Sequence, residues 1–209
     1  MSINAAVLLQ RPTLELIDSL SEADATPEQV VRTVARLRQA GHDHDVIHQA
    51  LEQLRLRRRA RDKFGPYADQ MLFTEAGLEQ ASRLAVAAHH AGRFHTAGIE
   101  AVADLGCGLG GDSMAFASLG LRVLAVDNDD TTAALASYNL ALFDNVSVVI
   151  GDALDTDLTG VDGVWMDPAR RDEHSRHSNP DLWSPPLDDA VTLARGFASG
   201  IKLAPGMDR

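Results

Sequence analysis

The feature that most constrains the fold is a glycine-rich stretch near the middle of the chain, VADLGCGLGGD, at residues 102–112. An apolar run leads into Asp104, four glycines follow it, and a helical pattern begins after them. Glycines let the backbone approach a ligand closely, and the first turn of a helix offers unpaired N–H groups. The stretch therefore predicts a cofactor site where a strand ends and a helix begins.

Strand-like and helix-like segments alternate around and after this stretch. Because strands separated by helices pair in parallel through right-handed crossovers, we predict a Rossmann-like, doubly wound, mostly parallel α/β sheet of about five strands. The expected strands are 99–105, 121–126, 146–150, 162–166 and 199–203, and the expected helices are 111–119, 130–142 and 187–197.

The first third of the chain has helical periodicity only. Helices are expected over 12–21, from a start at Thr26-Pro27 to Gly41, from about 43 to Gly65-Pro66, and over 75–91. We predict an N-terminal all-α domain over 1–65 and the α/β domain over 66–209.

Composition narrows the class of protein. A single cysteine among 209 residues excludes an intramolecular disulfide and a cysteine-based zinc site. The chain has no apolar run of membrane-spanning length, so no membrane association is expected. Its first twenty residues lack the basic segment and cleavage site of a secretory signal, which predicts a cytoplasmic protein.

Charge is unevenly distributed along the chain. Residues 1–63 hold ten Lys and Arg against nine Asp and Glu, while the remainder holds nine against twenty-one. The acidic remainder of the chain is poorly suited to binding a polyanion by itself. The basic run at 55–63 has two interpretations: a nucleic-acid contact, or a solvated helix end whose cations complement the helix dipole.

The histidines and the cysteine invite metal or nucleophile roles that their context does not favour. His44 and His48 share a helical spacing but lack the glutamate of an H-E-x-x-H motif, so no metal is predicted. His89, His90 and His95 are interpreted as surface residues near a helix end. Cys107 lies within the glycine turn and is interpreted as a small filler.

Four polar motifs follow four successive expected strands, at the sheet edge where open α/β sheets bind ligands. They are Asp104 with the glycines, Asp127 with Asn128, Gly151-Asp152-Ala153, and Asp167-Pro168. Their position predicts a single site at the carboxyl edge of the sheet.

The residues of these motifs discriminate between cofactors. Gly106, Gly108 and Gly111 satisfy the G-x-G-x-x-G dinucleotide pattern, but Asp104 would repel a pyrophosphate and attract a cationic amino group. Asp127 can accept hydrogen bonds from ribose hydroxyls, which NAD and S-adenosylmethionine (SAM) both carry. The residues favour SAM and leave an NAD-binding oxidoreductase as the disfavoured alternative.

The combined motifs resemble class I SAM-dependent methyltransferases. DLGCGLGG is similar to the first motif of that family, GDA to its adenine motif and DPAR to its fourth motif. Phe73-Thr74 resembles a segment of trimethylguanosine-synthase-like RNA methyltransferases that covers the methionine end of SAM. Glu79-Gln80, DPARR and KLAPG further resemble a bacterial group with a THUMP-like C-terminal domain.

The resemblance implies a role for each matching residue. Asp167 and Pro168 are the implied catalytic residues, which would align the amine of an acceptor, and RNA is the implied substrate and partner. The implied SAM-binding residues are Thr74, Asp104, Gly106, Gly108, Gly110, Asp127, Asn128, Asp152 and Ala153.

The chain departs from the family pattern in two places. Ala169 and Arg170 stand where base-amine methyltransferases have a second proline and an aromatic residue. Arg170, Arg171 and Trp183 are therefore the candidates for contacting the substrate. Five expected strands instead of seven predict a fragment that lacks the C-terminal strands, with an exposed sheet edge suited to self-association.

Two other functions remain open from the sequence. One is a methyltransferase that acts on a small molecule or a protein instead of RNA. The other is a non-catalytic module that binds SAM or nucleic acid.

Overall fold

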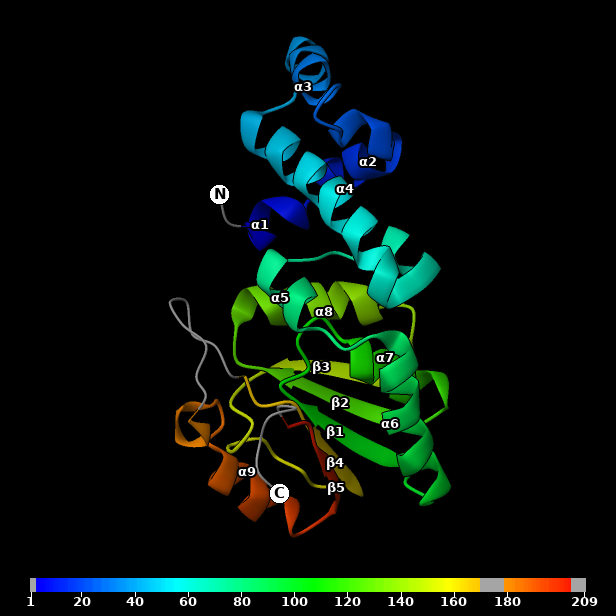
Figure 1. Ribbon diagram of the computed structural model, residues 1–209, viewed down its shortest axis with the longest axis vertical. Helices are drawn as coiled ribbons and strands as arrows, with labels where there is room; N and C mark the ends of the chain where they lie inside the picture. Colours follow the sequence, from blue (N-terminus) through cyan, green and yellow to red (C-terminus); the bar gives the residue numbers. More distant parts are fainter. Residues whose placement is uncertain (1–2, 170–178, 204–209) are drawn as a thin grey trace. The chain divides into compact units, whose positions relative to one another are not determined.

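The computed structural model describes residues 3–169 and 179–203, and these residues fall into two compact units that meet in the sequence between Ala81 and Ser82 (Figure 1). The division falls later in the chain than the boundary expected at 65/66, because segment 66–81 packs with the helices that precede it. The assignment of the two units as functional domains stays a prediction.

The N-terminal unit is helical and is built around its longest helix, α4. The apolar residues Ile47, Ala50, Leu51 and Leu54 follow helical spacing and are buried. Helix α4 ends as expected at Gly65, whose N–H donates to the carbonyl of Arg61. The elements of this unit are α1 (Ala5–Leu8), α2 (Arg11–Ser19), η1 (Glu22–Ala25), α3 (Val30–Gln39), α4 (His44–Phe64), η2 (Gly65–Asp69) and α5 (Glu75–Gln80).

Two helix boundaries differ from the expectation. Helix α3 begins at Val30 instead of Thr26, and the capping box is formed by Ser21 and Asp24 at the preceding turn. The helix expected over 75–91 is divided into α5 and a second helix that begins at Leu84. The Lys63 ammonium donates to the carbonyls of Leu78, Glu79 and Ala81, so a side chain from α4 satisfies the end of α5.

The C-terminal unit contains the predicted parallel sheet. Its strand order is β3-β2-β1-β4-β5, and every neighbouring pair is parallel. The chain steps outward from β1 to β3 and then returns to β4, which makes the boundary between β1 and β4 the topological switch point. The strands are β1 (Ala101–Leu105), β2 (Arg122–Asp127), β3 (Val146–Ile150), β4 (Gly163–Met166) and β5 (Ala198–Ile201).

Alternating side chains of the strands build a core on each face of the sheet. On one face, Trp165 packs among Phe94 and Phe116. On the other, Val164 and Met166 pack against Ala190 of helix α9. The helices of this unit are α6 (Leu84–Thr96), α7 (Gly111–Ser118), α8 (Asp130–Leu140) and α9 (Leu187–Ala194), with the short η3 (Pro180–Leu182).

The outer strands leave part of the sheet exposed. Val149 and Ile150 of β3 are largely accessible, and within residues 3–169 and 179–203 β5 pairs only with β4. No helix in the same ranges combines the length and the hydrophobicity that crossing a membrane requires.

Candidate functional site

The glycine turn after β1 has the backbone conformation that its sequence predicts. Gly106, Gly108 and Gly110 all have positive φ, at 83°, 55° and 88°, where residues with a Cβ are strained. The N–H groups of Gly106 and Cys107 both donate to the carbonyl of Val126, at 2.9 Å each. This pair of bonds ties the turn to the end of β2.

The turn also approaches the end of β4 closely. A Cβ placed on Gly106 would lie 3.2 Å from the carbonyl oxygen of Asp167. The first and fourth motifs are therefore neighbours at the switch point, as expected from the parallel order of the strands.

Asp127 lies where β2 ends and contacts the glycine turn directly. Its Oδ2 accepts from the Gly108 N–H at 2.9 Å, and its Oδ1 accepts from the Asp129 N–H at 3.1 Å. Burial raises the pKa of Asp127, although these hydrogen bonds oppose the shift. Each carboxylate oxygen can accept two hydrogen bonds, so this group can hold the turn and also receive hydroxyls of a ribose. The neighbouring Asn128 is exposed.

Asp104 is the most unusual side chain of the site. It is 1% exposed, and burial together with the charges of Asp112 and Asp167 raises its pKa to about 8. The Ser113 hydroxyl donates to its Oδ2 at 2.5 Å, which lowers the pKa but does not reverse the shift. A buried carboxyl group surrounded by other acids is a place where a bound cation would be stabilised.

Asp112, in the first turn of α7, contacts a histidine that stacks on a buried tryptophan. His90 Nδ1 lies 2.7 Å from Asp112 Oδ1, and the His90 ring stacks on Trp165 with centroids 4.1 Å apart. The interpretation of His90 as a surface residue is wrong, because its side chain is only 18% exposed. Its place on the inner face of α6 depends on packing against the sheet, for which local sequence carries no signal.

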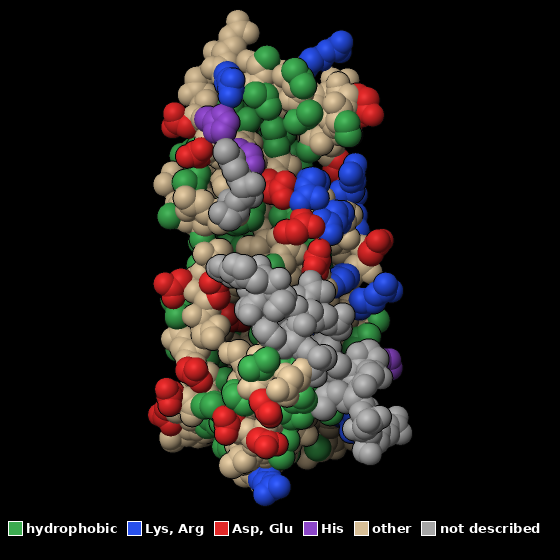
Figure 2. Space-filling view, turned by 60° about the vertical axis from the view of Figure 1, so that its left-hand side comes forward, with side chains coloured by type: hydrophobic (Ala, Val, Ile, Leu, Met, Phe, Trp, Pro, Cys, Tyr) green, Lys and Arg blue, Asp and Glu red, His purple; other side chains and the backbone are tan. Residues whose placement is uncertain are grey.

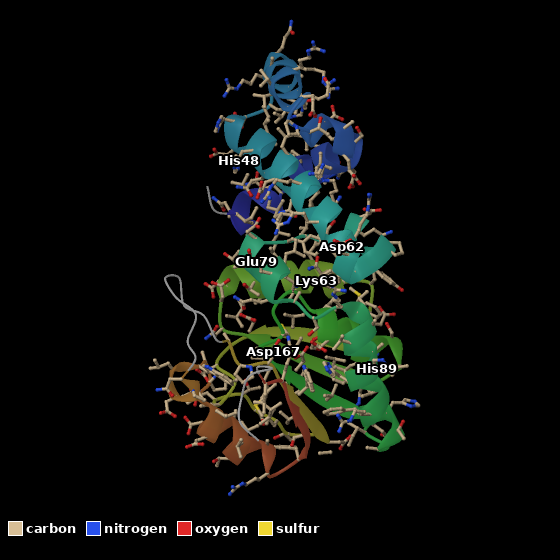
Figure 3. All side chains as sticks on the ribbon, in the orientation of Figure 1. His48, Asp62, Lys63, Glu79, His89 and Asp167 are labelled. Carbon is tan, nitrogen blue, oxygen red and sulfur yellow. The ribbon has the colours of Figure 1, made fainter. Side chains whose placement is uncertain are left out.

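Asp167 stands at the end of β4, where Figure 3 labels it. Its Oδ2 forms an ion pair with the Lys202 ammonium, which also donates to the Ser82 hydroxyl at 3.1 Å. Pro168 is buried beside it. In the sequence, Lys202 belongs only to the KLAPG resemblance, and its neighbours carry no signal for a partner 35 residues away.

The third motif lies at the end of β3, next to Asp127. The Gly151 N–H donates to the Asp127 carbonyl at 3.0 Å, and Asp152 Oδ1 accepts from the Leu154 N–H at 2.8 Å. The Asp152 side chain is exposed, whereas Ala153 packs against the core on the α9 face of the sheet. The turn is in place to line the side of a ligand that reaches Asp127.

The remaining predicted residues have different positions. Arg170 and Arg171 lie outside the described residues. Trp183 is 3% exposed, so in this conformation its indole has no open face on which a base could stack. Thr74 belongs to the N-terminal unit, where its hydroxyl accepts from the Gly77 N–H at 2.9 Å and caps α5.

Cys107 is buried in the glycine turn. Burial raises the pKa of the Cys107 thiol well above its usual range, so it stays protonated at neutral pH. Within the part of the chain that the structure describes, no group of three His, Cys, Asp or Glu residues is arranged to hold a metal ion.

The basic run on α4 is engaged within its own unit. Arg55 and Arg59 both pair with Glu75, and Arg61 pairs with Asp69 and Glu22. Figure 2 shows basic and acidic side chains interleaved on the surface, and Figure 3 labels Lys63 and Glu79. These contacts fasten segment 69–81 to α4 and neutralise part of the run, whereas Arg58 is exposed. A nucleic-acid contact by the run stays a prediction.

Buried contacts reinforce this attachment. Gln53 exchanges two hydrogen bonds with the Phe73 backbone, at 2.7 and 2.9 Å. The Arg57 Nε donates to the Met71 carbonyl at 2.9 Å, and the Arg57 side chain is buried. The side chains of α4 thus act as partners for an extended segment that has no strand beside it to satisfy its backbone.

Comparison with known proteins identifies sequence relatives of the chain and a solved structure with a similar fold. The chain is 34% identical over 164 residues to two uncharacterized SAM-dependent methyltransferases from two strains of Mycobacterium tuberculosis, covering 76% of this chain and 45% of each relative. It is similar to the crystal structure of a proposed methyltransferase from Porphyromonas gingivalis W83, with a TM-score of 0.65 and 22% identity over 92% of this chain and 48% of that chain. The α/β unit has the class I SAM-dependent methyltransferase fold.

The same comparisons set the extent of the likeness. The chain spans less than half the length of the Mycobacterium tuberculosis relatives. Residues 5–60, within the helical unit, match a domain of unknown function, DUF8688. In the α/β unit, the glycine turn, Asp127 and Asp167 lie at one edge of the sheet, which is the edge where open α/β sheets bind ligands.

Proposed function

We propose that the protein is a SAM-dependent methyltransferase. The observation that carries this proposal is Asp104, a fully buried carboxyl group beside a glycine turn, with a pKa raised to about 8 by burial and by neighbouring acids. A ligand with a cationic amino group compensates this site, whereas a pyrophosphate would add negative charge to it. The same argument disfavours an NAD-binding oxidoreductase.

The residues present fit SAM along the edge of the sheet. Asp104 would receive the amino group of its methionine portion, directly or through water, while the backbone at Gly106, Gly108 and Gly110 allows close approach. Asp127 would receive the ribose hydroxyls, since each of its oxygens can accept a second hydrogen bond. We assign the adenine to Asn128, Asp152 and Ala153.

The methyl-transfer step needs positioning more than proton transfer. Bound SAM would supply an electrophilic methyl group: the acceptor's lone pair would form a bond to the methyl carbon in line with the breaking C–S bond, and S-adenosylhomocysteine would leave as a neutral thioether. Asp167 and the Pro168 carbonyl, at the end of β4, would align the lone pair of an acceptor amine. The nearness of Gly106 to the Asp167 carbonyl is the contact that brings these residues beside the cofactor turn.

An RNA acceptor is the finer part of the proposal. It is supported by the resemblance of Phe73-Thr74 to a segment of trimethylguanosine-synthase-like RNA methyltransferases. The basic run adds less support, because Arg55, Arg59 and Arg61 of that run form ion pairs within the helical unit. Arg170 and Arg171 remain the proposed substrate contacts, and Trp183 joins them only on leaving its buried position. Thr74 as a cofactor residue, the THUMP-like relationship, a cytoplasmic location and self-association through the sheet edge stay predictions.

A methyl-transfer assay tests the activity. Protein and SAM with a labelled methyl group are incubated with total cellular RNA, with a cell protein extract and with a small-molecule extract, and incorporation is counted. We expect label in the RNA, located by nucleoside analysis, and its loss in Asp167→Ala. Label in the protein or small-molecule fraction alone would replace RNA as the acceptor; no transfer to any fraction by protein that binds SAM would contradict the activity.

A further inference from the structure

Lys202 lies just beyond β5, beside the end of β4. Its backbone N–H donates to the Met166 carbonyl at 2.8 Å, which extends the β4–β5 pairing by one residue. This bond fixes the start of the Lys202 side chain at the carboxyl edge of the sheet, next to Asp167. Under the proposed function, Asp167 lies at the acceptor.

The ammonium of Lys202 contacts one acidic side chain and one hydroxyl side chain. The ammonium forms an ion pair with Asp167 Oδ2 and donates to the Ser82 hydroxyl at 3.1 Å. The Lys202 and Asp167 side chains are each 24% exposed, and Ser82 is buried. A lysine at a sheet edge usually extends into water, so confinement between two partners is a specific feature of this position.

The charges around this pair are predominantly acidic. Asp104 at the end of β1 and Asp112 on α7 face the same region as Asp167, and His90 from α6 contacts Asp112. The charge of Asp167 is one of the causes that raise the pKa of Asp104. Among the described residues, Lys202 places an ammonium against Asp167, and this charge reduces the repulsion among Asp104, Asp112 and Asp167.

We propose that Lys202 is a positioning residue of the methyl-transfer site, which holds Asp167 in place as an anion with Ser82 as its second anchor. The proposal rests on the proposed function in that Asp167 orients the acceptor. Lys202 acts through Asp167 and does not itself touch SAM or the acceptor. A carboxylate held in this way accepts a hydrogen bond, so the acceptor that it orients is a nucleophile bearing an N–H or O–H group.

The test uses the ligand-free protein, so it does not depend on SAM binding. Aspartate carboxyl groups are labelled with ¹³C and titrated by NMR in wild type, Lys202→Met and Lys202→Arg, with Arg122→Met as a control that removes a cation from the opposite edge of the sheet. We expect Lys202→Met to move the titration midpoint of Asp167 upward by about one pH unit, because an adjacent cation favours the ionised form. The arginine variant keeps the wild-type midpoint, and the control leaves it unchanged.

Two outcomes overturn the proposal. One is an Asp167 midpoint that is the same in Lys202→Met and wild type. The other is loss of folding in Lys202→Met and also in Lys202→Gln, which would assign Lys202 to stability alone. SAM calorimetry on the same samples separates the two claims: wild type that does not bind SAM refutes the proposed function, while the NMR midpoints still decide the role of Lys202.

Discussion

Replacing Asp104 by Asn should stabilise the ligand-free protein and weaken its binding of SAM. The pKa of Asp104 is about 8 in the folded chain against an ordinary value of 3.8. Between these values the folded protein keeps a proton that the unfolded chain has released, so the free energy of unfolding falls as pH rises through this window. Each pKa unit corresponds to about 1.4 kcal/mol, which sets a ceiling of about 6 kcal/mol on the loss above pH 8.

Thermal unfolding of ligand-free protein at pH 5 and pH 8.5 measures this effect. Asp104→Asn carries no charge, so its midpoint should exceed that of wild type clearly at pH 8.5 and only slightly at pH 5. Asp144→Asn is the matched control, because Asp144 is exposed and precedes β3 at the opposite edge of the sheet. A variant that is less stable than wild type at pH 8.5 would refute the reasoning about buried charge.

The same ionisation determines how SAM affinity depends on pH. If SAM binds the ionised form of Asp104, affinity should fall about tenfold for each pH unit well below 8, and about 50-fold between pH 8 and pH 6. The amino group of SAM, with an ordinary α-amino pKa near 8, makes affinity fall again at higher pH. Calorimetry at pH 6 in two buffers of different ionisation enthalpy should detect about one proton released per SAM bound. An acid limb that persists unchanged in Asp104→Asn would assign it to another group.

Three further predictions concern single side chains. Asp127→Ala should weaken SAM binding about 10-fold to 100-fold in calorimetry, since it removes charged hydrogen-bond acceptors from the ribose; unchanged affinity would contradict the assignment. Gly106→Ala should lower the unfolding midpoint and abolish SAM binding, because its Cβ meets the Asp167 carbonyl at a positive φ; a variant with wild-type affinity would show that the turn is not at the cofactor. Lys63→Met should destabilise the N-terminal unit by about 1–3 kcal/mol, as carbonyls at the end of α5 lose a charged donor; hydrogen exchange at α5 measures this, and protection equal to wild type would refute it.

The order of elements in the α/β unit was predictable because its signals are local. The strand at 146–150 has the bounds expected from its apolar run, and the helix at 111–118 begins after the glycines as expected. Asp104, Asp127 and Asp167 could be placed at one edge because parallel strands all end there. The sequence does not show that Asp104 is buried among other acids, which depends on α7 and β4 packing around it.

The features that sequence reasoning missed depend on contacts between distant segments. The break between α5 and α6 coincides with the ammonium of Lys63, which lies at least 15 residues earlier in the chain. The ion pairs of Arg55 with Glu75 and of Arg61 with Asp69 also join residues that lie apart in the sequence. Lys202 and His90 likewise acquire their partners only through the fold.

A calorimetric titration of the wild-type protein with SAM, with NAD as the comparison, tests the central claim most directly. The account predicts that SAM binds at pH 8 with one site per chain, that NAD gives no heat of binding, and that Asp104→Asn loses most of the SAM affinity. Binding of NAD without binding of SAM would contradict the assignment of the glycine turn and Asp104 to a SAM site.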